Sequence, residues 1–151
     1  AECWDASCES CWRLLPPMHS ARMNGRASVL DGCIYVCGGL QGATRTLRSL
    51  ERFEPAVGAW RAMSSMLRPR AGFVLEAIGD GLYASGGFVC ASLPFGNVCK
   101  CAIADAERFC PGDSGGHWCR LPPMAAARML AASCVSGEHL YVCGGRGARS
   151  P

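Results

Sequence analysis

The chain has 151 residues, half of them hydrophobic and 18% charged, a balance that allows a packed core and excludes a disordered segment. A net charge of +3 is too small to indicate nucleic-acid binding. No apolar stretch reaches the length that crosses a bilayer, and the first residues lack the basic and apolar regions of a signal peptide. We therefore expect an internal segment of a longer protein.

Short strands separated by turns are expected along the first part of the chain. Glu2–Asp5 and the residues around Trp12 resemble the last two strands of a repeating unit. An apolar run, a turn at Asp31-Gly32, and a run rich in β-branched and aromatic residues then predict a hairpin. A loop over 40–48 leads to a third strand and a turn, and Trp60 lies in a fourth strand. The expected strands of this unit are Arg26–Leu30, Cys33–Cys37, Leu50–Phe53 and the residues around Trp60.

The rest of the chain repeats this order. The second unit begins with strands over 71–77 and 82–87 and ends with strands at Glu107–Phe109 and Trp118. Ten extra residues lie mainly between Gly87 and Glu107, and we expect the segment 88–104 to be a long loop, since insertions in repeat proteins map to loops on one face. The third unit supplies two strands, at 130–135 and 139–145.

Three sets of landmarks recur at fixed offsets. Each Trp-x5-Met block is followed four residues after its Met by an arginine, and each arginine is followed sixteen residues later by the first glycine of a pair. The landmarks are Trp12, Trp60 and Trp118; Arg22, Arg70 and Arg128; and Gly38-Gly39, Gly86-Gly87 and Gly144-Gly145. A period near 50 residues with four antiparallel strands per unit predicts an all-β propeller. We expect a half blade over 1–18, blades over 19–66 and 67–124, and a half blade over 125–151.

These motifs resemble kelch repeats, in which a double glycine follows an apolar strand and a tryptophan follows an aromatic of the third strand. Finer details, such as Glu51-Arg52-Phe53-Glu54-Pro55, are similar to kelch-like proteins that carry an upstream BTB domain. The resemblance implies a protein-binding module without enzymatic activity or cofactor. It implies substrate recognition for a cullin-type ubiquitin ligase adaptor, or alternatively a structural module that binds actin or another cytoskeletal partner.

The repeated arginines allow two interpretations. In the family that the chain resembles, the positions of Arg22, Arg70 and Arg128 lie near the channel mouth, where an arc of guanidinium groups would suit an acidic or phosphorylated peptide. The structural alternative is that each pairs with a repeated carboxylate, Glu51 or Glu107, or binds backbone carbonyls. The arginines outside the repeat pattern are better candidates for partner specificity, and these are Arg26, Arg45, Arg48 and Arg68. The tryptophans and glycine pairs are expected to be scaffold.

Twelve cysteines approach the density of a disulfide scaffold, but many lie inside apolar runs, where a thiol behaves as a small hydrophobe. We therefore expect a reducing, cytoplasmic environment. Only Cys8 and Cys11 have the spacing of a zinc knuckle, so we predict no metal site; redox sensing by the loop cysteines remains an alternative.

Catalytic patterns are not evident. His19, His117 and His139 share no useful spacing with one another or with a carboxylate, so surface or turn roles are expected. Gly112–Gly116 is similar to the sequence around a chymotrypsin-like nucleophile, but it precedes Trp118 in a predicted turn. A copper site like that of galactose oxidase would need gathered Tyr and His ligands, which we do not predict.

Two whole blades and two halves do not close a propeller, which usually has four to eight blades. Either the rest of the propeller belongs to a longer protein, or two copies of the chain complete each other. In the second case the C-terminal half blade of one copy pairs with the N-terminal half blade of another, and two copies make six blades.

Overall fold

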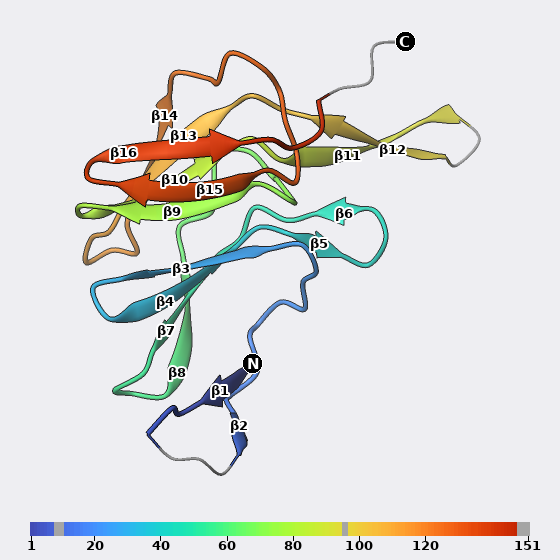
Figure 1. Ribbon diagram of the computed structural model, residues 1–151. Coiled ribbons are helices and arrows are strands. Elements are labelled where there is room, and N and C mark those ends of the chain that lie inside the picture. Colours follow the sequence, from blue (N-terminus) through green and yellow to red (C-terminus); the bar gives the residue numbers. More distant parts are fainter. Residues whose placement is uncertain (8–10, 95–96, 148–151) are drawn as a thin grey trace.

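The computed structural model describes residues 1–7, 11–94 and 97–147. Within these ranges the chain forms sixteen β-strands, and no helix is long and apolar enough to span a membrane. The strands form two four-stranded antiparallel sheets flanked by two-stranded sheets, arranged one after another along an arc (Figure 1). The all-β propeller expectation is thereby confirmed.

The first four-stranded sheet has the order β3-β4-β7-β8. Each pair is antiparallel, and Phe53 of the third strand lies opposite Trp60 of the fourth. The strands are β3 (Arg26–Leu30), β4 (Cys33–Cys37), β7 (Leu50–Glu54) and β8 (Ala59–Met63). All four lie where the repeat pattern predicts them.

The second four-stranded sheet repeats this order as β9-β10-β13-β14. Phe109 again faces Trp118 across the third and fourth strands. The strands are β9 (Val74–Ile78), β10 (Gly81–Ser85), β13 (Ala106–Cys110) and β14 (His117–Leu121). The segment 112–116, which is similar to a protease motif in sequence, lies in the turn between β13 and β14, as predicted.

Half sheets flank this pair. At one end β1 (Glu2–Trp4) pairs with β2 (Trp12–Leu14), and at the other β15 (Ala132–Ser136) pairs with β16 (His139–Cys143). By register, β1 and β2 correspond to third and fourth strands, whereas β15 and β16 correspond to first and second strands. The boundaries between units stay a prediction, because the links contact both neighbours: the Gly39 N–H donates to the carbonyl of Arg70 across one of them.

The segment 88–104 is not the long loop that we expected. It forms a hairpin of β11 (Phe88–Ser92) and β12 (Val98–Ala102), and a shorter hairpin of β5 (Leu40–Gln41) and β6 (Arg45–Thr46) replaces the expected loop over 40–48. Phe88 anchors the longer hairpin by packing with Leu40 and Ala71 in a separate apolar cluster. The loop prediction was therefore wrong, because tertiary packing supplies the apolar face that this segment needs.

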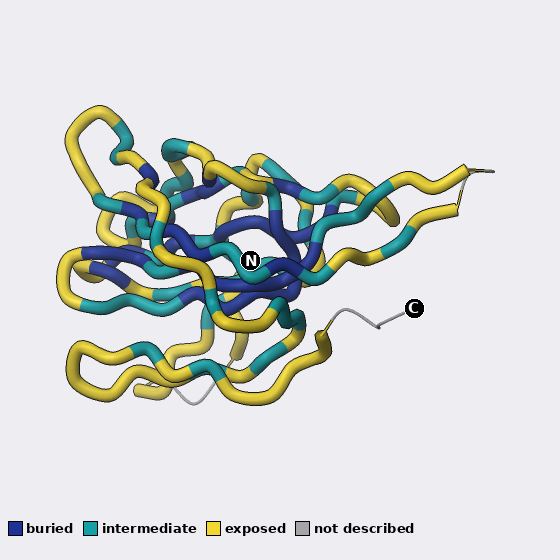
Figure 2. The backbone as a smooth tube through the Cα atoms, turned by 90° about the horizontal axis from the view of Figure 1, so that it is seen from above, coloured by how far each residue is buried: buried dark blue, intermediate teal, exposed yellow. Residues whose placement is uncertain are grey.

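The core lies between the two four-stranded sheets. Figure 2 shows the buried segments concentrated there, while Leu93 and Val98, in the outer part of the β11–β12 hairpin, are exposed. The rings of Tyr35 and Phe109, one from each sheet, lie 5.9 Å apart, and Phe73 and Leu82 are fully buried beside them. Burial of both faces of the inner strands explains the continuous apolar runs in the sequence.

The links between sheets form a hydrogen-bonded arc around the inner strands. The Gly72 N–H donates to the Asn24 carbonyl at 2.9 Å, and the Leu130 N–H donates to the Gly72 carbonyl at 2.7 Å. All three residues have φ between 53° and 57°. This repeated left-handed conformation, which is costly for Leu130, joins successive units at the same level of the propeller.

Candidate functional site

Each complete sheet buries a glutamate at its third strand. In the first sheet Glu51 accepts hydrogen bonds from the backbone N–H groups of His19 (2.7 Å) and Ser20 (3.2 Å) and pairs with Arg22. Arg22 also donates to the carbonyl of Gly38 at 2.7 Å. The guanidinium thus ties the third strand to the glycine pair.

The second sheet repeats this geometry atom for atom. Glu107 accepts from the N–H groups of Leu67 (2.7 Å) and Arg68 (3.3 Å) and pairs with Arg70, and Arg70 donates to the carbonyl of Gly86 at 3.0 Å. We call this arrangement, two successive backbone N–H groups and an arginine four residues after a methionine, the carboxylate cradle. Its charge pairing and hydrogen bonds together satisfy a buried carboxylate.

The cradle changes the ionisation of its carboxylate. Burial opposes ionisation of Glu51, but hydrogen bonds from the His19 backbone and from Arg22 outweigh it, so the pKa of this carboxyl lies below its ordinary value. The carboxylate is therefore charged at neutral pH and holds the link before β3 in place.

This geometry matches the structural alternative for the repeated arginines. Arg70 is 0% exposed, so a partner cannot reach it in this conformation. Arg22 is likewise turned inward, with 2% of its side chain exposed. Arg128 is partly exposed and donates to the carbonyl of Gly144 at 3.0 Å, and no carboxylate among the described residues pairs with it.

The other arginine candidates lie in different surroundings. Arg26 bridges the two sheets through a 2.8 Å bond from Nε to the Phe73 carbonyl. Arg45 and Arg48 are exposed, and Arg45 donates to the side chain of Gln41 on the same hairpin. Arg68 is exposed and forms an ion pair with Asp105, at 2.6 Å. Arg45, Arg48 and Arg68 are therefore accessible to a partner, whereas Arg26 contributes to the contact between sheets.

The two hairpins project from the same end of the molecule and lie side by side (Figure 1). The Cys90 N–H donates to Thr46 Oγ1 at 2.9 Å between them. We call this end the hairpin face; it comprises β5–β6, β11–β12, the links 64–73 and 122–131, and residues 144–147. The opposite end, made of the tight turns of each sheet, is the turn face.

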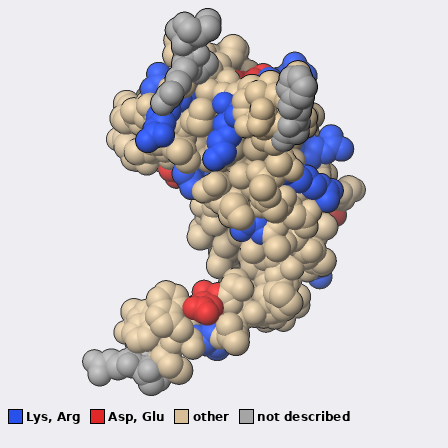
Figure 3. Space-filling model, turned by 90° about the vertical axis from the view of Figure 1, so that its right-hand side faces the viewer, with Lys and Arg blue, Asp and Glu red and all other residues tan. Residues whose placement is uncertain are grey.

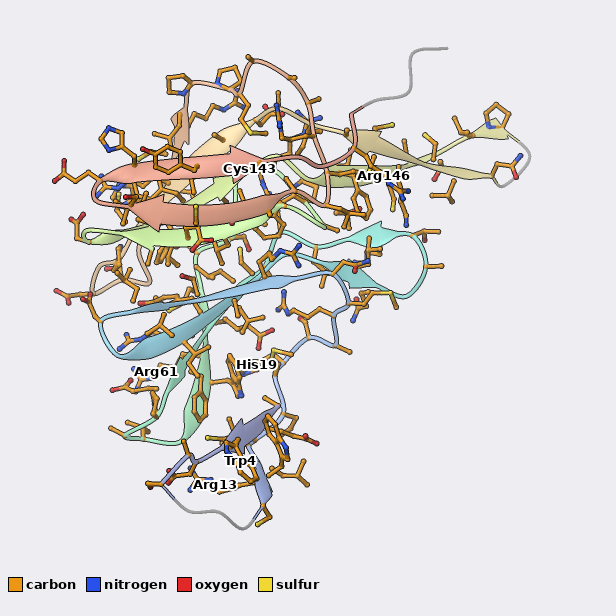
Figure 4. All side chains as sticks on the ribbon, in the orientation of Figure 1. Trp4, Arg13, His19, Arg61, Cys143 and Arg146 are labelled. Atoms are coloured by element: carbon orange, nitrogen blue, oxygen red, sulfur yellow. The ribbon has the colours of Figure 1, made fainter. Side chains whose placement is uncertain are left out.

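The two ends differ in the exposed charges that they gather. The exposed cations of the hairpin face include Arg45, Arg48, Arg68, Lys100 and Arg146. Blue side chains accordingly predominate on this face in Figure 3, and Figure 4 places Arg146 at the end of the molecule from which the hairpins project. The exposed carboxylates of the turn face include Asp31, Asp80, Asp113 and Glu138. The hairpin face therefore attracts anionic groups more strongly than the turn face does.

The hairpin face is also hollowed. One hollow of about 470 Å³ lies among Arg45, Arg48, Ser20 and Pro69. A second hollow of about 370 Å³ is lined by Arg68, Asp105 and Arg120, among others. Both lie where one sheet meets the link to the next, so partner side chains could enter between the sheets.

Sequence spacing missed one further cluster. Cys110, His117 and Cys119 bring their ligand atoms within 4.8 Å of one another on the β13–β14 hairpin. The same spacing argument also missed that His19 contacts Glu51, at 3.0 Å from Nδ1. The cluster depends on strand pairing, and a predicted hairpin register with Cys110 opposite His117 could have found it. The His19 contact depends instead on how the link before β3 packs against Glu51 of β7.

Comparisons with known proteins agree with this architecture. The family model for the kelch motif matches residues 21–67. Beta-scruin of Limulus polyphemus is 30% identical over 134 residues, which are 89% of this chain and 14% of that protein. Kelch-like protein 26 of Danio rerio is 28% identical over 136 residues, covering 89% of this chain and 20% of that protein. Kelch domain-containing protein 8B of Homo sapiens is 27% identical over 145 residues, covering 89% and 38%.

A solved structure shares the fold. The structure of YjhT superposes with a TM-score of 0.78 at 12% identity, over 91% of this chain and 43% of that one. The chain thus spans less than half the length of each relative named here. Together with the repeated sheets and their landmarks, these matches show that the chain is a segment of a kelch-repeat propeller.

Proposed function

We propose that the hairpin face recognises an acidic segment of a partner protein. Kelch repeats generally act as protein-interaction modules, which sets the class of function. The concentration of exposed cations on the hairpin face carries the proposal, because it makes this end of the propeller segment the more attractive one for an anionic group. The hollows beside Arg48 and Arg68 give partner side chains places to insert.

Arginine suits this role, because its planar guanidinium group binds carboxylates and phosphates through paired hydrogen bonds. Arg45 and Arg48 have no ion-pair partner among the described residues, and so both are available. Arg68 is already paired with Asp105, and a partner carboxylate would have to compete for it. Arg45 and Arg48 are therefore the primary contacts, and Arg68 is a secondary one.

Binding of a defined probe tests this proposal. We expect a fluorescent ten-residue peptide of alternating Glu and Ser, or its phosphoserine form, to bind the chain with an affinity that falls as salt rises. The double charge reversal Arg45→Glu with Arg48→Glu is expected to weaken binding about tenfold or more. The matched control is Arg61→Glu, at an exposed arginine far from the hairpin face (Figure 4). Equal weakening by the control, or no binding of either peptide, contradicts the proposal.

A finer proposal concerns the cellular role. Similarity to Kelch-like protein 26 and the Glu-Arg-Phe-Glu-Pro motif favour substrate recognition for a cullin-type ubiquitin ligase adaptor. The alternative is a structural module that binds actin or another cytoskeletal partner. Co-purification of the full-length protein with a cullin, compared with its sedimentation with actin filaments, distinguishes the two. Cullin association without filament binding supports the first role, and the reverse result supports the second.

A further inference from the structure

Three side chains of the β13–β14 hairpin form a compact group of metal-ligating atoms. Cys110, the last residue of β13, lies opposite His117, the first residue of β14, and Cys119 follows two residues later. Residues that face each other across two strands, and residues two apart along one strand, lie on the same side of a sheet. All three side chains therefore leave the hairpin on one side, and their ligand atoms lie within 4.8 Å of one another.

These separations are close to those that a tetrahedral zinc centre requires. Bonds of about 2.3 Å to sulfur and about 2.0 Å to nitrogen, at tetrahedral angles, place two ligand atoms about 3.5–3.8 Å apart. The ligand atoms of the hairpin therefore need to approach one another by only about 1 Å. Rotation of a cysteine side chain about its Cα–Cβ bond moves the sulfur by more than this, so the strands can stay where they are.

The propeller framework does not require these residue types. The two complete sheets share one register, in which an aromatic residue of the third strand lies opposite the tryptophan of the fourth. By this register, the three ligand positions correspond to Glu54, Ala59 and Arg61 of the first sheet. A carboxylate, a methyl group and a guanidinium group occupy them there. Unlike the tryptophans and the glycine pairs, the thiols and the imidazole are therefore not repeated scaffold.

Packing does not account for the two cysteines either. Cys33 and Cys37 are buried in the core, where a thiol serves as a small apolar group. Cys110 is half-buried, and Cys119 is exposed, as is His117. The register that groups these three residues lies within one complete sheet, so it does not depend on any neighbouring unit.

The opposite side of the hairpin holds the two strands in place. The rings of Phe109 and Trp118 lie 5.3 Å apart there, and both residues are buried. Trp118 Nε1 also donates to the Ser64 carbonyl at 2.8 Å. Because His117 and Cys119 flank Trp118 in the sequence, anchoring of the tryptophan fixes the backbone from which both ligands project. Ligands on anchored strands are positioned more precisely than ligands on loops.

The turn beside the cluster is anchored as well. The Ser64 N–H donates to the Gly115 carbonyl at 3.1 Å, and Ser64 Oγ donates to the Gly116 carbonyl at 2.6 Å. Gly116 has a φ of 72°, and a Cβ at this position would lie 2.5 Å from the ring of Phe109. The turn thus packs closely against the strand that ends at Cys110. Folding therefore orders the ligand backbone before any ion binds, which lowers the entropic cost of binding.

We propose that Cys110, His117 and Cys119 bind one Zn²⁺ through two thiolates and one imidazole. Thiolate sulfur and imidazole nitrogen suit zinc, whereas Mg²⁺ and Ca²⁺ prefer oxygen ligands. Binding releases the two thiol protons to solvent. The fourth tetrahedral position is open to water or to a group of another molecule, which distinguishes this site from closed structural sites with four protein ligands. The ion links β13 to β14 beside the turn face.

Cobalt substitution in the reduced protein tests this proposal. Titration with Co²⁺ should produce the near-ultraviolet absorption of a cobalt–thiolate complex, and added Zn²⁺ should abolish it. The site variant, Cys110→Ser with Cys119→Ser, should bind Co²⁺ at least about tenfold more weakly, since the loss of ligands costs at least as much as the loss of their outer partners. The matched control is Cys99→Ser with Cys101→Ser, which removes two thiols whose sulfur atoms lie 3.4 Å apart on the β11–β12 hairpin. The control should keep its Co²⁺ affinity.

Thermal unfolding gives a second readout that does not depend on absorption. Added Zn²⁺ should raise the Tm of the wild type and of the control but not that of the site variant, because an ion that binds only the folded site stabilises it. Circular dichroism without metal checks that both variants fold. No thiolate absorption at about 100 μM Co²⁺, equal loss of binding in the two variants, or an equal rise of Tm in all three proteins overturns the proposal. These results do not depend on acidic-peptide binding to the hairpin face, because the ligands lie beside the turn face.

Discussion

The complete sheets and the half sheets carry the same landmarks in different surroundings. Trp118, in a complete sheet, is 7% exposed, and Trp12, in a half sheet, is 64% exposed. Arg70 is buried against Glu107, while its counterpart Arg128 has a cradle without a described carboxylate. The comparison teaches that a repeated residue is scaffold only where the neighbouring strand is present. Elsewhere the same residue is a potential contact for another strand.

Replacement of the repeated tryptophans should show the largest difference. We expect Trp118→Ala to lower the free energy of unfolding by about 3–5 kcal/mol, because it removes a buried ring and its bond to Ser64. Trp12→Ala should cost less than about 1 kcal/mol, because its ring is mostly in solvent. Urea unfolding of the two variants measures both costs. Equal costs at the two positions would remove the distinction between complete and half sheets.

The first glycine of each pair gives a matched comparison at constant backbone conformation. Gly38 and Gly144 have φ of 59° and 67°, but a Cβ on Gly38 would lie 2.5 Å from the carbonyl oxygen of Arg70, and a Cβ on Gly144 would meet nothing within 4 Å. We expect Gly144→Ala to cost about 1 kcal/mol from its left-handed conformation alone. Gly38→Ala should cost about 2–3 kcal/mol, since the clash is added. Thermal unfolding of the two variants measures the difference, and a reversed order would contradict the stacking of the link on Gly38.

Acid should weaken the cradle of the first sheet. Because the pKa of Glu51 is lower in the folded state than in the unfolded chain, its contribution is present above the unfolded value of about 4.3 and is lost as the pH falls through the folded pKa. Stability measured by urea unfolding should therefore fall less steeply below about pH 4 in Glu51→Gln than in the wild type. Glu138→Gln, at an exposed turn, is the control and should leave the slope unchanged. Parallel pH profiles for Glu51→Gln and the wild type would show that the cradle does not lower this pKa.

Chemical labelling of the cysteine thiols is the smallest perturbation, because it needs no substitution in the chain. Cys37 and Cys143 occupy equivalent positions before a glycine pair, yet Cys37 is fully buried and Cys143 is exposed. Burial raises the pKa of the Cys37 thiol to about 12. Iodoacetamide at pH 8, followed by mass spectrometry, should label Cys143 in the folded chain and Cys37 only in urea. Equal labelling of both in the folded chain would contradict the burial of the first sheet.

The local pattern was sufficient to predict the propeller strands. Apolar runs such as Cys33–Cys37, the turn at Asp31-Gly32 and the glycine pairs are short-range signals, and the strands lie where these signals place them. The hairpin at 88–102 was missed, because Phe88 is buried by residues far away in sequence, Leu40 and Ala71. Long-range packing of this kind has no local signature.

The candidate site was only partly accessible to sequence reasoning. Pairing of the repeated arginines with Glu51 and Glu107 was foreseen as one of two alternatives, because the residues repeat at matching positions. The backbone donors of the cradle were not predicted, because the type of a residue does not show which carboxylate its N–H group will bind. The grouping of exposed cations on one face also depends on the positions of the hairpins, which the sequence pattern had assigned to loops.

A double-mutant cycle on Arg70 and Glu107 tests the central claim most directly, namely that the repeated arginine holds its own sheet by pairing with the third strand. Unfolding free energies of Arg70→Met, Glu107→Gln and the double variant are compared with that of the wild type. Each single change should cost about 3 kcal/mol or more, because it leaves a buried charge without its partner. The double variant should then be at least about 2 kcal/mol more stable than the sum of the single costs predicts. Additivity within about 0.5 kcal/mol would show that the two residues act independently and would contradict the cradle.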